Sequence, residues 1–379
     1  MLIVMTSPDA ILRNGRPDPA LVAVLVKTKA AQNPVGLISN GAEPDWFAGA
    51  FAGSGVQFLH SPGRQRGDVV ARNAAKFTLN PFDVLVLATK AEDVQMGKNG
   101  GAVLVAAGWS NAPEVRALGI RVDTAQQLQE VIDLTSGWAG QWWYSGRATR
   151  YQVRALADLS GYGKADAQVV FARRLTDTVK NGGSRLNALL AVTARSLLTD
   201  GTGSQQNLVW GVYPSSASGN DDTEVLSDFT HRLRTTVSQV RFAKRDEPLF
   251  VRHSPSSKRS QGGGGDRTDP TEQIQTLHLN PFYKANGRLK GKNVIVIDDC
   301  TTYGVSFGVA AAFLRKAGAA SMTGVALGKF GNQLRHYDID INVDPFAPVP
   351  GDGFTVTNID QFDDGTNANS QQLLRDLIR

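Results

Sequence analysis

The stretch Val294-Ile-Val-Ile-Asp-Asp-Cys-Thr-Thr-Tyr-Gly-Val-Ser306 decides how the second half of the chain folds. Its leading apolar residues predict a buried β-strand, and the small and hydroxylated residues after the acids predict a loop. An apolar pattern of helical period continues through Phe307, Ala311 and Leu314, and Gly318 marks its end. A strand, a loop and a helix in this order indicate an α/β domain with a parallel sheet.

This loop has the composition of an anion-binding site. Backbone N–H groups at the entrance to a helix form a cup for a phosphate, and the hydroxyls of Thr301, Thr302 and Ser306 could add donors. Asp298 and Asp299 end the strand and would face ribose hydroxyls or a metal bound to them. We therefore expect a binding site for a phosphorylated sugar. An ordinary strand, turn and helix of an α/β domain is the alternative.

The stretch resembles the signature of the type I phosphoribosyltransferases, in which a buried strand precedes two acidic residues and a phosphate loop. Here the loop is residues 302–306; Tyr303 replaces the threonine most often found there, and Gly304 and Val305 follow. The resemblance implies that this loop binds the 5-phosphate of 5-phosphoribosyl 1-diphosphate (PRPP). It further implies that Asp298 and Asp299 bind the ribose hydroxyls and Mg²⁺, and that Asp299 is the general base.

An upstream loop resembles the diphosphate loop of the same family, whose competence-protein F branch is the most similar one. An expected strand at residues 208–213 ends at Pro214, and Ser215 and Ser216 follow it. Small residues there would let backbone N–H groups approach a diphosphate, although Pro and Ser after a strand are also ordinary turn chemistry. The resemblance covers roughly residues 145–330.

A basic, glycine-rich span lies between these two loops, where the family has its flexible catalytic flap. It contains Lys258, Arg259 and Arg267, with four glycines between the last two. The resemblance implies that Lys258 and Arg259 are catalytic and close over the diphosphate. A solvated charged loop is the alternative.

In the first half of the chain, short apolar runs alternate with helical segments. The runs predict strands at residues 2–5, 35–38, 84–88 and 103–106, and the alternation predicts a parallel sheet covered on both faces. This half resembles the haloacid-dehalogenase-like phosphatase fold, and three of its residues match positions of that family. They are Ser39, Lys76 and Asp93.

The departures from that family concern its acids. The chain has Met5-Thr-Ser-Pro-Asp9 where the family has two aspartates after the first strand, and Ala88-Thr89 where it has Gly-Asp. A phosphoaspartyl mechanism needs a carboxylate nucleophile and a Mg²⁺ site of several carboxylates. We therefore expect a catalytically inactive relative; the alternative is that Asp9 has become the nucleophile.

The expected fold class is α/β, with two Rossmann-like domains that each contain a mainly parallel sheet with helices on both faces. The haloacid-dehalogenase-like domain would span residues 1–134, the phosphoribosyltransferase domain residues 135–330, and a C-terminal extension residues 331–379. A chain of 379 residues, 41% of them hydrophobic, is long enough for two cores.

The composition also limits the cellular compartment and the classes of binding partner that we expect. The single cysteine, Cys300, excludes an internal disulfide, and the chain lacks both a long apolar run and a secretory signal. We therefore expect a cytoplasmic protein without a membrane partner. The net charge of +5 suits anionic small molecules, and no basic stripe with interleaved aromatics indicates a nucleic acid. A homodimer is compatible with the sequence.

Three functions are compatible with this sequence. The first is a Mg²⁺-dependent phosphoribosyltransferase that transfers phosphoribose from PRPP to a small-molecule acceptor. The second is a sensor that binds PRPP or a nucleotide without turnover, and the third is a bifunctional phosphatase and phosphoribosyltransferase. The acceptor itself cannot be read from the sequence, because fold-level analogy does not identify it.

Overall fold

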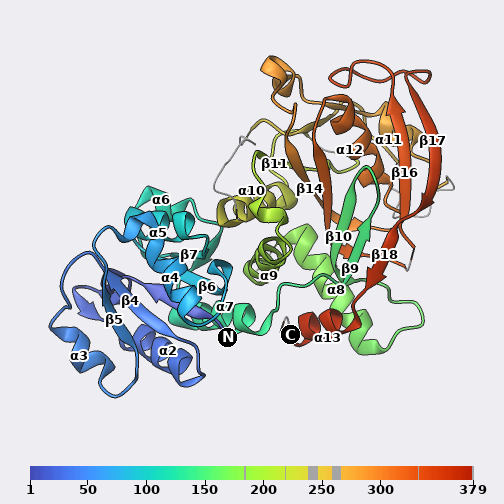
Figure 1. The fold of residues 1–379 in the computed structure, drawn as a ribbon. Helices are drawn as coiled ribbons and strands as arrows, with labels where there is room; N and C mark the ends of the chain where they lie inside the picture. The colour runs from blue at the N-terminus through green and yellow to red at the C-terminus, as the bar shows by residue number, and fades with distance from the viewer. Residues whose placement is uncertain (183–184, 218, 238–245, 258–265, 332, 378–379) are drawn as a thin grey trace. The chain divides into compact units, whose positions relative to one another are not determined.

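The computed structural model describes residues 1–182, 185–217, 219–237, 246–257, 266–331 and 333–377, and they form two compact units (Figure 1). The first unit comprises Met1–Gly140, Asn187–Ser204 and Arg232–Gln239. The second comprises Gln141–Leu186, Gln205–His231 and Val240–Arg379.

The first unit is built on a six-stranded parallel sheet with the order β5-β4-β1-β6-β7-β8. The central strands are short apolar runs that are buried on both faces, as strands of a parallel sheet must be. The strands are β1 (Ile3–Thr6), β4 (Val35–Ser39), β5 (Gln57–His60), β6 (Val84–Ala88), β7 (Val103–Ala107) and β8 (Ile120–Val122), and a small ribbon pairs β2 (Leu12–Arg13) with β3 (Arg16–Pro17).

Helices form two layers on this sheet. In one layer α2 packs with α3 and α7, and in the other α5 packs with α4 and α6 (Figure 1). Helix α2 begins where Asp18 accepts a hydrogen bond from Ala20 N (2.8 Å) and Pro19 occupies the first turn. The helices are α1 (Pro8–Ile11), α2 (Pro19–Ala30), α3 (Trp46–Phe51), α4 (Asp68–Lys76), α5 (Ala91–Gly100), α6 (Pro113–Arg116) and α7 (Ala125–Gly137), with 3-10 turns η1 (Arg64–Arg66), η2 (Pro81–Asp83) and η3 (Thr202–Ser204); α9 (Leu186–Thr199) lies in this unit from Asn187 on.

The second unit contains a mixed sheet with the order β11-β14-β15-β10-β9-β18. Its first four strands are parallel, β9 pairs antiparallel with β10, and β18 pairs antiparallel with β9. The strands are β9 (Tyr144–Arg147), β10 (Gln152–Asp158), β11 (Leu208–Val212), β14 (Asn293–Thr301), β15 (Ser321–Lys329) and β18 (Asp363–Thr366). Residues 331–379, set apart as an extension in the sequence, therefore supply one strand of this sheet.

Helices cover both faces of the second sheet. Helix α12 packs on the face formed by Val294 and Val296, and the alternation of side chains turns Ile295 and Ile297 to the other face, where α8 contacts β14. The remaining elements are α8 (Asp166–Asn181), α10 (Val225–Val237, in this unit up to His231), α11 (Thr271–Gln275), α12 (Val305–Lys316) and α13 (Ala368–Leu377), the 3-10 turns η5 (Pro281–Tyr283) and η6 (Ala285–Gly287), and two antiparallel pairs, β12 (Phe250–Arg252) with β13 (Leu277–Leu279) and β16 (Arg335–Ile341) with β17 (Phe354–Gln361).

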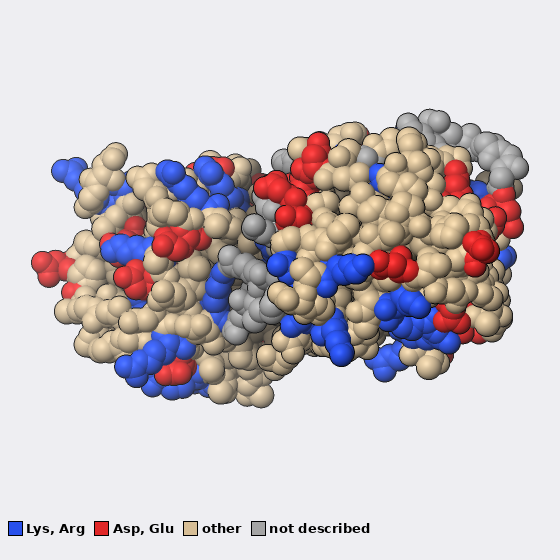
Figure 2. All heavy atoms as spheres, turned by 90° about the horizontal axis from the view of Figure 1, so that it is seen from above, with Lys and Arg blue, Asp and Glu red and all other residues tan. Residues whose placement is uncertain are grey.

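The structure confirms the predicted fold class of two α/β domains with mainly parallel sheets. Within the described residues, no helix has the length and apolar character that crossing a membrane requires. On the face in Figure 2, Lys and Arg side chains form small groups among acidic and uncharged residues rather than one continuous stripe.

Candidate functional site

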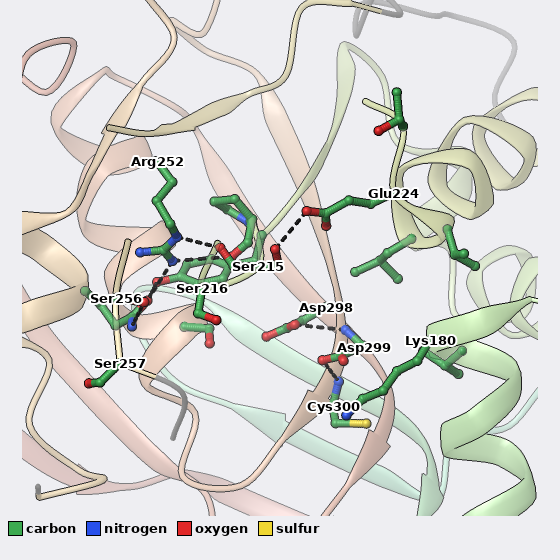
Figure 3. Close-up of a pocket in the computed structure, with 18 residues that line it drawn as sticks. Lys180, Ser215, Ser216, Glu224, Arg252, Ser256, Ser257, Asp298, Asp299 and Cys300 are labelled. Atoms are coloured by element: carbon green, nitrogen blue, oxygen red, sulfur yellow. Dashed lines mark hydrogen bonds between the residues drawn. The ribbon is translucent and has the colours of Figure 1, made fainter. Parts of the chain in front are cut away.

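The candidate site lies where β11 and β14, two neighbouring parallel strands, reach their carboxyl ends. Because such strands end at the same edge of a sheet, the loops that follow them meet there. A cavity of about 740 Å³ opens at this edge. Its lining includes Ser215 and Ser216 after β11, Asp298, Asp299 and Cys300 in β14, Ser306 in α12 and Lys180 in α8 (Figure 3).

Asp298 and Asp299 are neighbouring acids at a partly buried position, where two negative charges are unfavourable. Asp298 is only 8% exposed, and burial, followed by the charge of Asp299, raises its pKa well above the usual range. Hydrogen bonds from Asp299 N to Asp298 Oδ1 (2.8 Å) and from Cys300 N to Asp299 Oδ1 (2.5 Å) fix both carboxylates. Within the described part of the chain, neither acid forms an ion pair. A ligand or a cation would relieve this unfavourable charge.

The 302–306 loop exposes unused backbone donors at the start of α12. Gly304 precedes the helix with φ +84, a left-handed conformation that favours glycine, and a Cβ there would lie 3.0 Å from Arg335 O. Arg335 N also donates to Tyr303 O (3.0 Å), which holds the loop in place. The backbone N–H groups of Thr302–Ser306 have no acceptor among the described residues, as expected for the first turn of a helix.

A second cavity, of about 490 Å³, faces this loop. Arg267 and Tyr303 lie on its wall, with the guanidinium 5.9 Å from the ring centroid. Its lining consists of Lys180, Arg267, residues 299–306 and Phe330. Lys180, Asp299, Cys300 and Ser306 line both cavities, so the acid at the end of β14 and the 302–306 loop lie on adjoining cavities.

Arg252 holds the 214–216 loop in position. This arginine is 4% exposed and donates from Nε to Ser215 O (2.6 Å) and from one terminal nitrogen to Pro214 O (3.3 Å). It also donates to Gln273 Oε1 (3.0 Å) and Thr276 Oγ1 (2.8 Å). A guanidinium presents several donors in a rigid plane, so these bonds fix the course of the loop backbone.

The predicted loop residues Ser215 and Ser216 both line the first cavity, but their roles differ. The Ser215 hydroxyl donates to Glu224 Oε1 (2.8 Å), so it is already engaged within the protein (Figure 3). Ser216 accepts a hydrogen bond at its backbone oxygen from Ser256 N (2.9 Å). Binding of an anion at this loop would therefore use backbone N–H groups and the Ser216 hydroxyl.

Lys180 is a site residue that the sequence analysis did not identify. It lies in the last turn of α8, and its side chain extends toward Cys300 (Figure 3). It forms no ion pair within the described residues, and it lines both cavities. Burial, then the charges of Asp299 and Asp298, raise the pKa of the Cys300 thiol well above its usual value, and Lys180 opposes this. A thiol whose pKa is raised in this way is a poor nucleophile, because the thiolate is the reactive form.

The predicted catalytic residues Lys258 and Arg259 lie outside the described residues. Of the three cations expected in the flap, Arg267 is described and reaches the second cavity. Two acids of the C-terminal residues form ion pairs: Asp338 lies 3.0 Å from Arg150, and Asp344 lies 2.7 Å from Lys284.

In the first unit, Ser39 at the end of β4 and Asp93 in the first turn of α5 lie at the carboxyl ends of the strands, whereas Lys76 ends α4, which leads back toward the start of β6. Asp93 is fully buried in the first turn of α5, and Arg64, not Lys76, contacts it (2.7 Å). Lys76 lies 5.7 Å from the Phe77 ring. Asp9 forms an ion pair with Lys90 (2.7 Å). No described group of three or more His, Cys, Asp or Glu residues could hold a metal alone.

The comparisons with known proteins are sparse. No protein-family model and no curated protein matches the chain. Among solved structures, a cobalt-bound deoxy-D-mannose-octulosonate 8-phosphate phosphatase from Haemophilus influenzae is 14% identical, covers 36% of this chain and 90% of its own, and gives a TM-score of 0.30. A protein described as a HAD family hydrolase from Streptomyces avermitilis is 16% identical over 28% of this chain and 66% of its own, with a TM-score of 0.23.

A third solved structure extends over most of the chain. UMP synthase from Leishmania donovani is 12% identical, covers 86% of this chain and 85% of its own, and gives a TM-score of 0.22. Scores this low do not define a common fold, so the functional argument rests on the residues of the site.

Proposed function

We propose that the second unit is a Mg²⁺-dependent phosphoribosyltransferase that transfers phosphoribose from PRPP to a small-molecule acceptor. One observation carries this proposal: the neighbouring acids Asp298 and Asp299 and the unused N–H groups of the 302–306 loop line two adjoining cavities that share Asp299 and Ser306. Such a cavity offers both an anion cup and acceptors for sugar hydroxyls, which a pentose phosphate requires.

In this proposal each part of PRPP meets a different element. The 5-phosphate accepts hydrogen bonds from the N–H groups of the 302–306 loop and from the Ser306 hydroxyl. Asp298 and Asp299 accept hydrogen bonds from the ribose hydroxyls. The diphosphate lies between the 214–216 loop and Lys180, whose ammonium group lines the cavity.

The residues present fit a Mg²⁺ ion. Mg²⁺ is bound in proteins through one or two carboxylates together with water and phosphate oxygens of a substrate, and Asp298 and Asp299 are two adjacent, uncompensated carboxylates. When bound, Mg²⁺ would neutralise charge on the departing diphosphate. The absence of a third described acidic or histidine ligand agrees with a metal that is completed by the substrate.

The chain's own residues perform three tasks in the transfer. Arg252 keeps the 214–216 loop in one conformation, so that its donors are aligned before the diphosphate develops charge. Lys180 provides a positive charge at the leaving group. Asp299, which lines both cavities and is less buried than Asp298, is placed to accept the proton of the acceptor as the bond from the acceptor to C1 forms.

The test combines binding with turnover. The full chain is titrated with PRPP by calorimetry in the presence of Mg²⁺, and diphosphate release is then followed with a panel of nucleobases and small amines. The proposal expects both binding and acceptor-dependent release, and both should be lost in the Asp298→Asn, Asp299→Asn double variant. Binding without release for any acceptor would favour the sensor, and absence of PRPP binding would exclude both functions.

A further inference from the structure

A buried ion pair occupies the strand-end site of the first unit. The guanidinium of Arg64 lies 2.7 Å from Asp93 Oδ1, and the two side chains are 5% and 0% exposed. The same guanidinium donates to Ile38 O at the end of β4 (2.7 Å). One cation therefore connects the end of β4 to the first turn of α5.

The second oxygen of Asp93 is saturated by donors of the protein. Asp93 Oδ2 accepts hydrogen bonds from the Ser7 hydroxyl (2.9 Å), from Thr89 N (2.9 Å), from the Thr89 hydroxyl (3.2 Å) and from Lys90 N (3.1 Å). Oδ1 is buried and has the Arg64 guanidinium as its only partner among the described residues, so one oxygen faces a cation and the other has four donors. A carboxylate in this state has no free oxygen with which to coordinate a metal.

The other positions at this edge offer no replacement ligands. Thr6 and Ser7 follow the first strand in place of carboxylates, and the Thr6 hydroxyl donates to Leu87 O (2.9 Å). Asp9 is held by Lys90 (2.7 Å). Asp93 and Asp9 therefore each have their own cation, in contrast to a metal site, where several carboxylates share one.

We infer that Arg64 is the resident cation of this site, in place of the divalent metal that the resemblance to the haloacid-dehalogenase-like phosphatases implies. A divalent ion brought next to Asp93 would meet a buried guanidinium at close range, and like charges at such distances in a poorly solvated site repel strongly. The first unit therefore binds no divalent metal at this site, and the phosphoaspartyl chemistry of the third function lacks its metal here.

Metal rescue provides the experiment. All variants carry Asp298→Asn and Asp299→Asn, which remove the acids of the second unit, and unfolding of the full chain is followed by calorimetry with EDTA, Mg²⁺ or Co²⁺. In this background we expect that the melting temperature does not depend on the metal. Arg64→Ala should lower the melting temperature of the first unit by on the order of 10 °C, because it leaves Asp93 buried and unpaired. Co²⁺ should restore part of that loss.

Two further variants control the result. Arg64→Lys keeps a positive charge, so it should lose less stability than Arg64→Ala and should gain nothing from Co²⁺. Arg66→Ala removes an exposed arginine of the same turn and should behave like the background. If Arg64→Ala does not fold, Mn²⁺ binding to the background chain, measured by electron paramagnetic resonance, still decides. Bound Mn²⁺ there, metal-dependent melting of the background, or an Arg64→Ala variant as stable as the background would each overturn the inference.

Discussion

Each unit has an acidic site at the carboxyl ends of its parallel strands, and the two sites differ in how their charge is balanced. In the first unit, Asp93 is fully buried and pairs with Arg64 at 2.7 Å. In the second, Asp298 and Asp299 lie side by side without an ion-pair partner in the described part of the chain, and burial together with the charge of Asp299 raises the pKa of Asp298.

This difference makes the site of the second unit the better candidate for binding a ligand. A buried charge is unfavourable unless it is paired, so a protein that keeps an unpaired acidic site retains a cost that a bound partner can remove. The first unit has removed that cost with its own arginine. Position at a sheet edge alone would make both sites equally good candidates, and charge balance distinguishes them.

The largest predicted effect on turnover follows when the two acids of the second unit are replaced by asparagine, and the same replacement in the first unit serves as the comparison. Asp298→Asn with Asp299→Asn should reduce kcat/KM for PRPP by roughly 10²–10³-fold, the range typical for loss of preorganised charge in a site. It should leave the free energy of unfolding unchanged or higher, because repulsion between the carboxylates is lost. Diphosphate release and urea unfolding measure the two quantities.

Asp93→Asn is the matched change in the first unit. It should lower the free energy of unfolding by about 3 kcal/mol, since Arg64 stays buried without its partner, and it should leave kcat/KM for PRPP as in the unsubstituted chain. If Asp93→Asn abolished PRPP turnover, or if the double variant of the second unit were the one that unfolded, the contrast between a closed and an open site would be wrong.

Arg252 sharpens the contrast, because it is a buried arginine that donates to the carbonyl oxygens of Pro214, Ser215 and Gln273. Arg252→Met should lower the free energy of unfolding by about 2 kcal/mol, as the acceptors at Pro214, Ser215 and Gln273 lose their donors. It should raise KM for PRPP about tenfold as the 214–216 loop loses its fixed course. Arg252→Lys should recover part of the stability. Arg174→Met, at an exposed position of α8, is the control, and a KM equal to that control would contradict the positioning role.

Contiguous patterns account for what could be predicted from the sequence. Four strands of the first sheet were predicted because β1, β4, β6 and β7 are unbroken apolar runs. The remaining two were missed: Gln57–His60 has only partly buried or exposed side chains, and Ile120–Val122 is three residues long with an arginine in the middle. Strands with so little apolar pattern are defined by pairing with neighbours, which a local window does not contain.

The sequence predicted only those site residues that are neighbours along the chain. Asp298 to Ser306 are one stretch, whereas Lys180 and Arg252 reach the same cavity from other elements, so their roles depend on how α8 and β12 pack. Arg64 was missed for a local reason. Gly63 (φ 74) and Gly67 (φ 87) adopt left-handed conformations on either side of η1, and Arg64 in this short turn is buried. A three-residue turn has no periodic pattern from which the burial of an arginine could be predicted.

Replacing Lys180 tests whether this lysine contacts the ligand of the second unit or instead pairs with Asp298 and Asp299. Lys180→Met should raise KM for PRPP about tenfold, because a charge-assisted contact with the diphosphate is lost, and should leave the free energy of unfolding within about 0.5 kcal/mol. Lys316→Met changes an exposed lysine that lines neither cavity and should have no effect on KM. A large loss of stability in Lys180→Met would indicate instead that this lysine pairs with the acids, as Arg64 does.

Lys329 carries the smallest predicted effect and extends the contrast to a buried amine whose burial outweighs the charges of Asp158 and Asp364. It pairs in register with Thr301, is fully buried, and donates to the backbone oxygens of Phe330 and Gly331. Burial lowers its pKa to about 8 from 10.5. Above pH 8 the folded chain therefore releases a proton that the unfolded chain keeps up to about pH 10.4. The free energy of unfolding should thus rise with pH in this window, by on the order of 1 kcal/mol between about pH 8 and pH 9 relative to Lys329→Met.

Urea unfolding of both chains measures the difference, with Lys316→Met as the exposed control. A difference that stays constant or falls across this window would mean that Lys329 is stabilised as a cation, and the second unit would then contain a buried charge balanced as completely as the one in the first.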